Sequence, residues 1–120
     1  MSRPISPRLH GIIDYGLLMM WAGIPRLLKL SPRVRNVFTA MDAAQAALNA
    51  VTDQHYAVRR IVPFPVHGRI EKYSLPLYVV LPLAAGAWGD RRSRAYFLGA
   101  GAALLLNFSL TDWDASSAGA

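Results

Sequence analysis

Two histidines in this chain are each followed, four residues later, by a carboxylate. His10 precedes Asp14, and His67 precedes Glu71. Residues four apart lie on the same side of a helix, so each imidazole can contact its carboxylate. Imidazole and carboxylate groups together can bind a transition metal, carry protons, or form a structural hydrogen-bond network. The spacing therefore indicates two equivalent polar sites whose chemistry depends on what surrounds them.

The two His–carboxylate pairs belong to an internal repeat. Residues 10–25 read HGIIDYGLLMMWAGIP, and residues 67–82, 57 positions further on, read HGRIEKYSLPLYVVLP. The end of each half matches at an offset of 59, which places Thr52-Asp53 on Thr111-Asp112. We predict two tandem helical hairpins, each opening with His-Gly and closing with Thr-Asp. Repeat 1 covers about residues 8–53 and repeat 2 about residues 65–114.

Composition favours a membrane over nucleic acid as the partner of this chain. Of the 120 residues, 53% are hydrophobic and only 17% are charged, which is below the usual quarter. The net charge is +6, and the basic residues stand mostly at the edges of apolar blocks, where lipid headgroups would meet them. The chain has no cysteine, which excludes disulfides and thiolate metal ligands.

Four apolar blocks are the candidate helices. They run from about Leu9 to Leu30, Val37 to Val51, Ile70 to Trp88 and Ala95 to Leu110. A soluble bundle would show a polar stripe on each helix, and the last two blocks show none. We expect residues 88–94 to form a turn, the segment with Pro63 and Pro65 to be non-helical, and the tail 115–120 to be disordered. The small residues of blocks two and four predict that these two helices pack tightly against each other.

The predicted fold is all-α: one domain, residues 1–120, forming a four-helix transmembrane bundle. Both hairpins run in the same sense, so the expected symmetry is a pseudo-twofold axis along the membrane normal. This topology places the polar residues of the repeat at one membrane face, together with both termini. The six residues are His10, Asp14, Asp53, His67, Glu71 and Asp112.

Three interpretations of this polar cluster stay open. In the one we favour, it is a structural network that needs no cofactor and ties the hairpins together. In the second, His10, His67, Asp14 and Glu71 hold a transition metal, or the two histidines hold a haem, with the adjacent glycines admitting the flat cofactor. In the third, Asp14 and Glu71 carry protons in a small transporter. The sequence shows no arrangement of catalytic residues, so an enzyme is the less favoured class.

The motifs also resemble those of a group of small uncharacterised bacterial membrane proteins. They are His10-Gly11 with Asp14-Tyr15, Thr52-Asp53, Pro63-Phe64-Pro65-Val66-His67-Gly68 with Glu71, and Thr111-Asp112-Trp113. The resemblance implies a multi-pass protein of the bacterial inner membrane, with the bilayer as its partner, and no particular activity. Self-association is left open. The denser basic charge of the two hairpin turns predicts that they face the cytoplasm and that the termini face outside.

Overall fold

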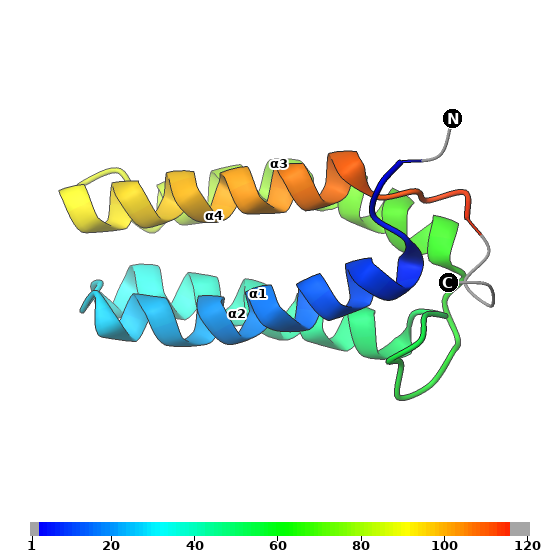
Figure 1. Ribbon diagram of the computed structural model, residues 1–120. Helices are drawn as coiled ribbons and strands as arrows, with labels where there is room; N and C mark the ends of the chain where they lie inside the picture. The colour runs from blue at the N-terminus through cyan, green and yellow to red at the C-terminus, as the bar shows by residue number, and fades with distance from the viewer. Residues whose placement is uncertain (1–2, 116–120) are drawn as a thin grey trace.

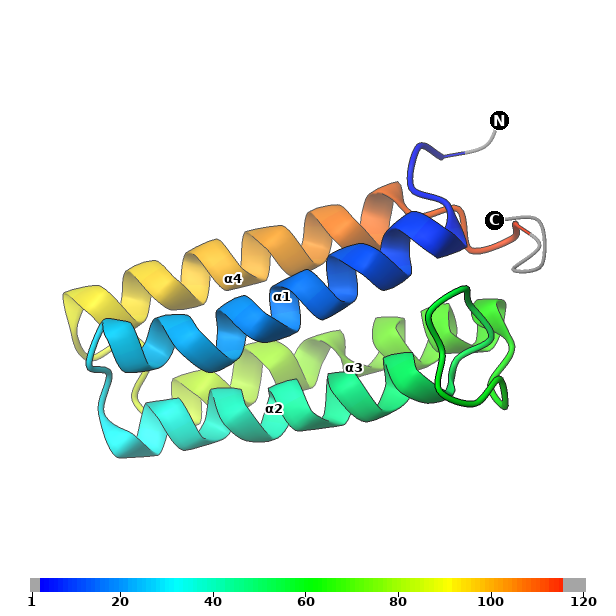
Figure 2. The same cartoon turned by 60° about the horizontal axis from the view of Figure 1, so that its bottom comes forward.

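The computed structural model describes residues 3–115, which form a bundle of four helices (Figure 1). They are α1 (Pro7–Leu27), α2 (Pro32–Val51), α3 (Phe64–Ala84) and α4 (Arg91–Leu110). The main contacts are α1 with α2, α2 with α3, α3 with α4, and α4 with α1. Both hairpins run in the same direction, so that α1 and α3 begin, and α2 and α4 end, at the same end of the bundle (Figure 2). The all-α fold built from two tandem hairpins is therefore confirmed.

The expected close pairing of α2 with α4 is wrong. The two helices are diagonal to each other in the ring of contacts. Their small residues lie largely on outer surfaces instead: Ala43, Ala44 and Ala47 are exposed on α2, and Gly99 and Ala102 are exposed on α4. The polar and bulky residues of these helices, rather than the small ones, face the interior.

Helix starts follow from local capping. The side chains of Ser6 and Ser31 accept hydrogen bonds from the first turns of α1 and α2, and a proline follows each serine. Asp90 caps α4 by accepting hydrogen bonds from the Ser93 N–H and hydroxyl, and these bonds lower the pKa of Asp90 below its usual value. Such caps satisfy N–H groups that have no partner within the helix.

Two predicted boundaries need correction. Residues 91–94 begin α4 rather than complete a turn, because the Asp90 cap starts the helix there. The loop predicted around Pro63 and Pro65 ends earlier, since α3 begins at Phe64 and includes Pro65. Proline is tolerated in the first turn of a helix, where its missing N–H would have no partner anyway. The predicted tail lies outside the described residues from residue 116 onward.

The hairpin turns repeat each other in detail. Lys29 (φ 54°) and Gly86 (φ 99°), 57 residues apart, both adopt the left-handed conformation. The carbonyls of Pro25 and Pro82, also 57 apart, accept hydrogen bonds from Leu30 N–H (3.0 Å) and Ala87 N–H (2.9 Å). The repeat read from the sequence is thus present in the backbone, including at Lys29, where a side chain occupies a conformation that favours glycine.

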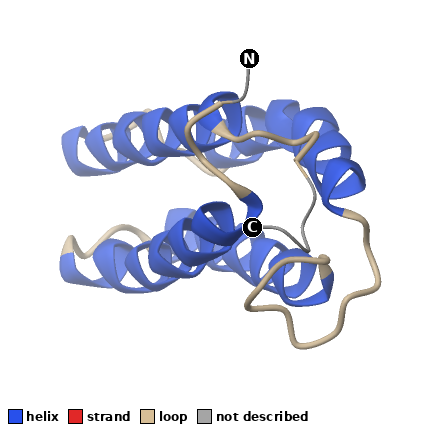
Figure 3. Cartoon of the chain, turned by 45° about the vertical axis from the view of Figure 1, so that its right-hand side comes forward, coloured by secondary structure: helices blue, strands red, loops and turns tan. Residues whose placement is uncertain are grey.

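The opposite end of the bundle is closed by two equivalent crossings of the chain. The Asp53 N–H donates to the Val62 carbonyl and the Asp112 N–H donates to the Ile5 carbonyl, both at 2.7 Å. Figure 3 shows these loops at the end where α1 and α3 begin. The second crossing joins the start of the chain to the end of α4, so it connects the two hairpins.

The interior changes character along the bundle axis. Near the hairpin turns it is apolar, with Trp21, Val34, Phe38, Tyr96 and Leu104 all buried. The Phe38 and Tyr96 rings meet edge to face with centroids 4.8 Å apart. Towards the termini the buried side chains are polar: His10, Asp14, Gln45, Asn49, Thr52, Gln54, His67, Glu71, Asn107 and Thr111. The bundle therefore places its histidines and acids in its interior.

The transmembrane part of the fold prediction is not supported by hydropathy. Within residues 3–115, none of the helices combines the length and the apolar character needed to cross a bilayer. The physical reason lies in the helix sequences. Each carries polar or charged residues, such as Asp14 in α1, Asp42 in α2, Glu71 in α3 and Arg94 in α4.

Candidate functional site

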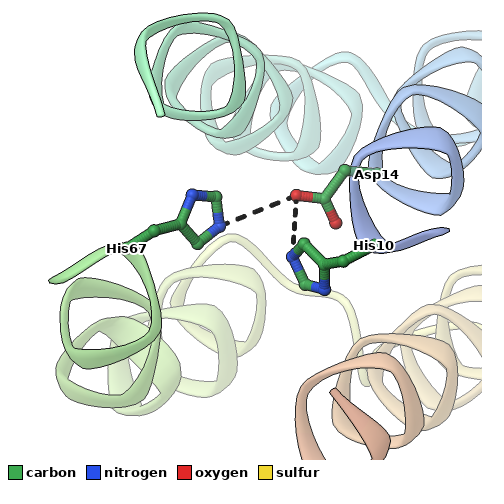
Figure 4. A group of neighbouring side chains, drawn as sticks. All are labelled: His10, Asp14 and His67. Atoms are coloured by element: carbon green, nitrogen blue, oxygen red, sulfur yellow. Dashed lines mark ion pairs between the residues drawn. The ribbon is translucent and has the colours of Figure 1, made fainter. Parts of the chain in front are cut away.

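Four ionisable side chains meet between α1 and α3. His10 and Asp14 project from the first turns of α1, and His67 and Glu71 occupy the equivalent positions of α3. His10, His67 and Glu71 are completely buried, and Asp14 is 4% exposed. Figure 4 shows Asp14 lying between the two imidazoles. The structure thus merges the two predicted pairs into one site, which we call the His–carboxylate cluster.

Within the cluster, histidine nitrogens and carboxylate oxygens alternate. His10 Nε2 lies 3.1 Å from Asp14 Oδ2 and 3.7 Å from Glu71 Oε2. His67 Nε2 lies 3.1 Å from Glu71 Oε2 and 3.7 Å from Asp14 Oδ2. The shorter contacts are within one helix and the longer contacts join the two hairpins. All four side chains therefore direct one atom towards a shared centre.

The two cluster histidines are held by threonines from the ends of α2 and α4. His67 Nδ1 is 2.6 Å from Thr52 Oγ1, and His10 Nδ1 is 2.8 Å from Thr111 Oγ1. Each hydroxyl donates its proton to the carbonyl four residues earlier, that of Leu48 or Asn107.

A hydroxyl has one proton, so each threonine oxygen must accept from its histidine, and Nδ1 of each histidine carries a hydrogen. In a neutral imidazole this leaves Nε2 as a bare lone pair. Nε2 of each histidine faces the carboxylates, and His67 Nε2 is hydrogen-bonded to Glu71 Oε2 at 3.1 Å, which requires a proton on one of these two atoms.

Asparagine supports only one of the two carboxylates. Asn107 Nδ2 donates to Asp14 Oδ1 at 2.8 Å. Position 48 is the repeat equivalent of 107 and holds leucine. Accordingly, Glu71 Oε1 is buried without a hydrogen-bond partner among the described residues. The duplication is therefore exact in the histidines and threonines but not in the support of the acids.

Aromatic rings cover the cluster at the termini end. Trp113 contacts His10 edge to face with centroids 4.6 Å apart and stacks on His67 at 5.5 Å. Phe64 stacks on Trp113 at 4.9 Å. The imidazole rings themselves meet edge to face at 5.3 Å. This apolar cover removes the cluster from water and raises the cost of any uncompensated charge within it.

The glycines after the histidines accommodate the chain itself. A Cβ at Gly68 would lie 2.6 Å from Trp113, and a Cβ at Gly11 would lie 2.9 Å from Gln54 Cδ. Gln54 and Trp113 occupy equivalent positions in the two repeats. In this structure these two side chains, and not a flat cofactor, fill the space beside the glycines.

Two of the six predicted site residues lie away from the cluster. Asp53 is partly exposed, with Oδ1 3.8 Å from Arg60 Nε, and Asp112 is also partly exposed. Thr52 and Thr111 have extended backbones, with ψ of 140° and 135°. The chain leaves the helix at each threonine, so the side chain of the next residue points away from the interior of the bundle. The threonine of each Thr-Asp pair, rather than the aspartate, reaches the cluster.

Sequence reasoning missed Asn107, whose amide donates to Asp14 Oδ1. Its position offered a signal, because Asn107 and Thr111 are four residues apart on one helix and share a face. Phe64 was also missed as part of the cover.

No family model, curated protein or solved structure matches this chain. The chemistry of the cluster therefore rests on its own geometry.

Proposed function

We propose that this chain is an integral membrane protein whose His–carboxylate cluster locks its two hairpins together inside the bilayer. The observation that carries the proposal is the inverted distribution of side chains. Polar groups fill the interior at the termini end of the bundle, whereas large apolar side chains cover much of the outside. Exposed examples on three helices are Met19, Met20, Leu77, Val79, Val80, Leu98, Leu105 and Leu106.

The exposed side chains of the bundle support this proposal better than the mean hydropathy of each helix does. Leu106 is 61% exposed, Val80 57% and Met19 77%. Large exposed apolar patches are rare on monomers in water, and exposed large apolar side chains are numerous on α1, α3 and α4. Asp14, Gln45, Glu71 and Asn107 lower the hydropathy of their helices, yet all four are buried in the interior rather than directed outward.

Helix length and charge placement agree with a bilayer. Helices of 20 or 21 residues are about 30 Å long, which is the thickness of the hydrocarbon core. The basic residues of the turn end are Arg26, Lys29, Arg33, Arg35, Arg91, Arg92 and Arg94. Such a group of cations suits anionic headgroups at the cytoplasmic face. The resemblance noted from the sequence motifs favours the bacterial inner membrane.

The role of the cluster follows from how it crosses between hairpins. Thr111 of the second hairpin binds His10 of the first, and Thr52 of the first binds His67 of the second. In each hairpin the Nδ1–H of the buried histidine therefore has its acceptor in the other hairpin. Because unsatisfied polar groups are costly in an apolar interior, the network favours the assembled four-helix bundle over separated hairpins.

The other interpretations receive less support. A haem between the histidines would need a wide flat space, but their rings are in contact, and the cavity beside Asp14 holds only about 10 Å³. Proton transport by Asp14 and Glu71 remains the alternative. It predicts that Asp14→Asn and Glu71→Gln fold normally but lose proton-driven flux in vesicles.

Membrane extraction tests the proposal. We expect the protein to sediment with membranes, to resist alkaline carbonate and to require detergent for release. Recovery in the supernatant after lysis without detergent would contradict membrane insertion. A chain that enters membranes but whose H10A and H67A variants are as stable as the wild type would contradict the locking role alone.

A further inference from the structure

We propose that His10, Asp14, His67 and Glu71 bind one divalent transition-metal ion, of which Zn²⁺ is the representative. This inference goes beyond the locking role, because it gives the cluster a ligand. It rests on the cluster itself and does not require a bilayer.

The first argument is the spacing of the converging atoms. Ligand atoms in a tetrahedral site with bonds of about 2.0 Å are about 3.3 Å apart. The four nitrogen–oxygen separations around the cluster are 3.1, 3.7, 3.1 and 3.7 Å. One ligand atom each from His10, Asp14 and His67 lies within 4.8 Å of the others. His10, Asp14 and His67 thus supply three neighbouring ligand atoms. Glu71 Oε2, 3.7 Å from His10 Nε2 and 3.1 Å from His67 Nε2, is placed to be the fourth.

The second argument is the direction of the lone pairs. His10 Nε2 and Asp14 Oδ2 are buried and 3.1 Å apart, yet neither has a hydrogen-bond partner. A separation of 3.1 Å without a hydrogen bond is the spacing expected of two neighbouring ligands of one ion. The Thr52 and Thr111 contacts fix a hydrogen on each Nδ1, so Nε2 is the ligand atom of each neutral imidazole. At His67 a bound ion would replace the hydrogen bond between Nε2 and Glu71 Oε2.

The third argument is charge. With both carboxylates ionised and both imidazoles neutral, which is the state that binds a metal, the cluster would carry a charge of −2 in an interior covered by aromatic rings. Burying such charge without compensation is costly, and a divalent cation neutralises it. Protonation of both histidines would also neutralise it. However, only His67 and Glu71 have the alignment for a hydrogen bond within their pair.

The surroundings of the cluster match those of metal ligands. A metal-bound histidine usually donates its other N–H to an oxygen, and ligating carboxylates are themselves hydrogen-bonded. Here Thr111 and Thr52 accept from the histidines, and Asn107 donates to Asp14 Oδ1. Two imidazoles with two carboxylates, in a chain without cysteine, suit Zn²⁺, Fe²⁺ or Mn²⁺. An ion held by α1 and α3 would cross-link the two hairpins.

Metal binding by the purified protein tests the inference. The full chain, with detergent if it needs detergent, is stripped with a chelator, checked for helicity and titrated with Zn²⁺. We expect one ion per chain, a rise in thermal midpoint, and tetrahedral absorption bands when Co²⁺ replaces Zn²⁺. His55, the third histidine, is exposed in a loop outside the cluster, so H55A is the matched control and should bind as the wild type does.

Variants of the cluster residues distinguish a metal site from a hydrogen-bond network that holds no metal. H10A and H67A should lose the Co²⁺ bands and bind Zn²⁺ at least 100-fold more weakly. Because an alanine variant can fail to fold, D14N provides a nearly isosteric second test, and added Zn²⁺ should not raise its thermal midpoint. The inference is overturned if folded wild-type protein binds no stoichiometric Zn²⁺, Fe²⁺ or Mn²⁺, or if H55A loses binding as H10A does. Both measurements are independent of where the protein fractionates, so failure of membrane insertion is a distinguishable result.

Discussion

Thr111, at the end of α4, accepts a hydrogen bond from His10, at the start of α1, across 101 residues of sequence. Thr52 and His67 make the same contact across 15 residues. The His10–Thr111 contact thus joins the first helix to the end of the last helix. Its repeat equivalent joins only the two helices that flank the loop between the hairpins. The same local geometry therefore constrains very different lengths of chain.

Replacing either threonine with valine should destabilise the bundle. The valine keeps the shape but leaves a buried Nδ1–H without an acceptor, which costs about 1–3 kcal/mol. Chemical unfolding followed by circular dichroism measures this loss for T52V and T111V.

Thr39 gives a matched control for this loss. Its hydroxyl also donates to a carbonyl four residues earlier, that of Arg35, and among residues 3–115 it makes no hydrogen bond to a histidine. T39V should change stability by less than either cluster variant. Equal losses of stability in all three variants would show that the hydrogen bonds to the histidines do not contribute more than an ordinary threonine hydroxyl does.

The same two variants bear on the metal. Groups that orient a metal ligand typically contribute 10- to 100-fold to affinity. We therefore expect T52V and T111V to weaken Zn²⁺ binding by about that factor, measured by competition with a chromogenic chelator. Unchanged affinity in folded variants would show that the threonines do not position the ligands.

The difference between Asn107 and Leu48 predicts opposite effects at equivalent positions. N107L removes the donor to Asp14 Oδ1 and should cost about 1–3 kcal/mol. L48N places an amide where its repeat equivalent supports a carboxylate, so it should supply Glu71 Oε1 with a donor and be neutral or stabilising. The pair is compared by unfolding midpoints. Equal destabilisation by L48N and N107L would contradict the equivalence of these positions.

Glycine substitutions test the close packing beside the histidines. G68A should destabilise by about 1–3 kcal/mol, because the new methyl group overlaps Trp113. G99A is the control in α4, since nothing lies within 4 Å of a Cβ there, and it should stabilise by up to about 1 kcal/mol through helix propensity. Thermal unfolding of the two variants provides the comparison. A G68A variant as stable as G99A would mean that Trp113 moves aside freely.

The sequence predicted the fold well because the repeat constrains it. Once His10 and His67 are equivalent and each half is a hairpin, the two hairpins must run in the same direction and bring the histidines to one end. The apolar blocks begin at Val37 and Ala95, whereas α2 and α4 begin at Pro32 and Arg91. A single capping residue, Ser31 or Asp90, sets each start, and the hydropathy of a whole block does not reveal it.

The site was predicted only in part, for geometric reasons. His10, Asp14, His67 and Glu71 follow from spacing of four on one helix. The contact of each histidine with the threonine of the other hairpin depends on how the helices are rotated, which spacing within one helix does not determine. Asp53 and Asp112 were misassigned because the backbone becomes extended at the preceding threonine and turns them outward.

The absence of cysteine from the chain permits a direct test of bilayer insertion and orientation. Single cysteines are introduced at Leu106, on the outer face of α4 and 61% exposed, at Val58, in the α2–α3 loop and 80% exposed, and at Arg91, at the exposed start of α4. Intact cells are treated with a membrane-impermeant maleimide.

We expect V58C to react from outside, because it lies at the termini end. R91C should react only after the cells are permeabilised, because the basic turn end faces the cytoplasm. L106C should stay unreactive until detergent removes the lipid around it, whereas in a water-exposed bundle its exposure would make it as reactive as V58C. Labelling of L106C in intact membranes would therefore contradict insertion, and labelling of V58C and R91C from the same side would contradict the spanning topology.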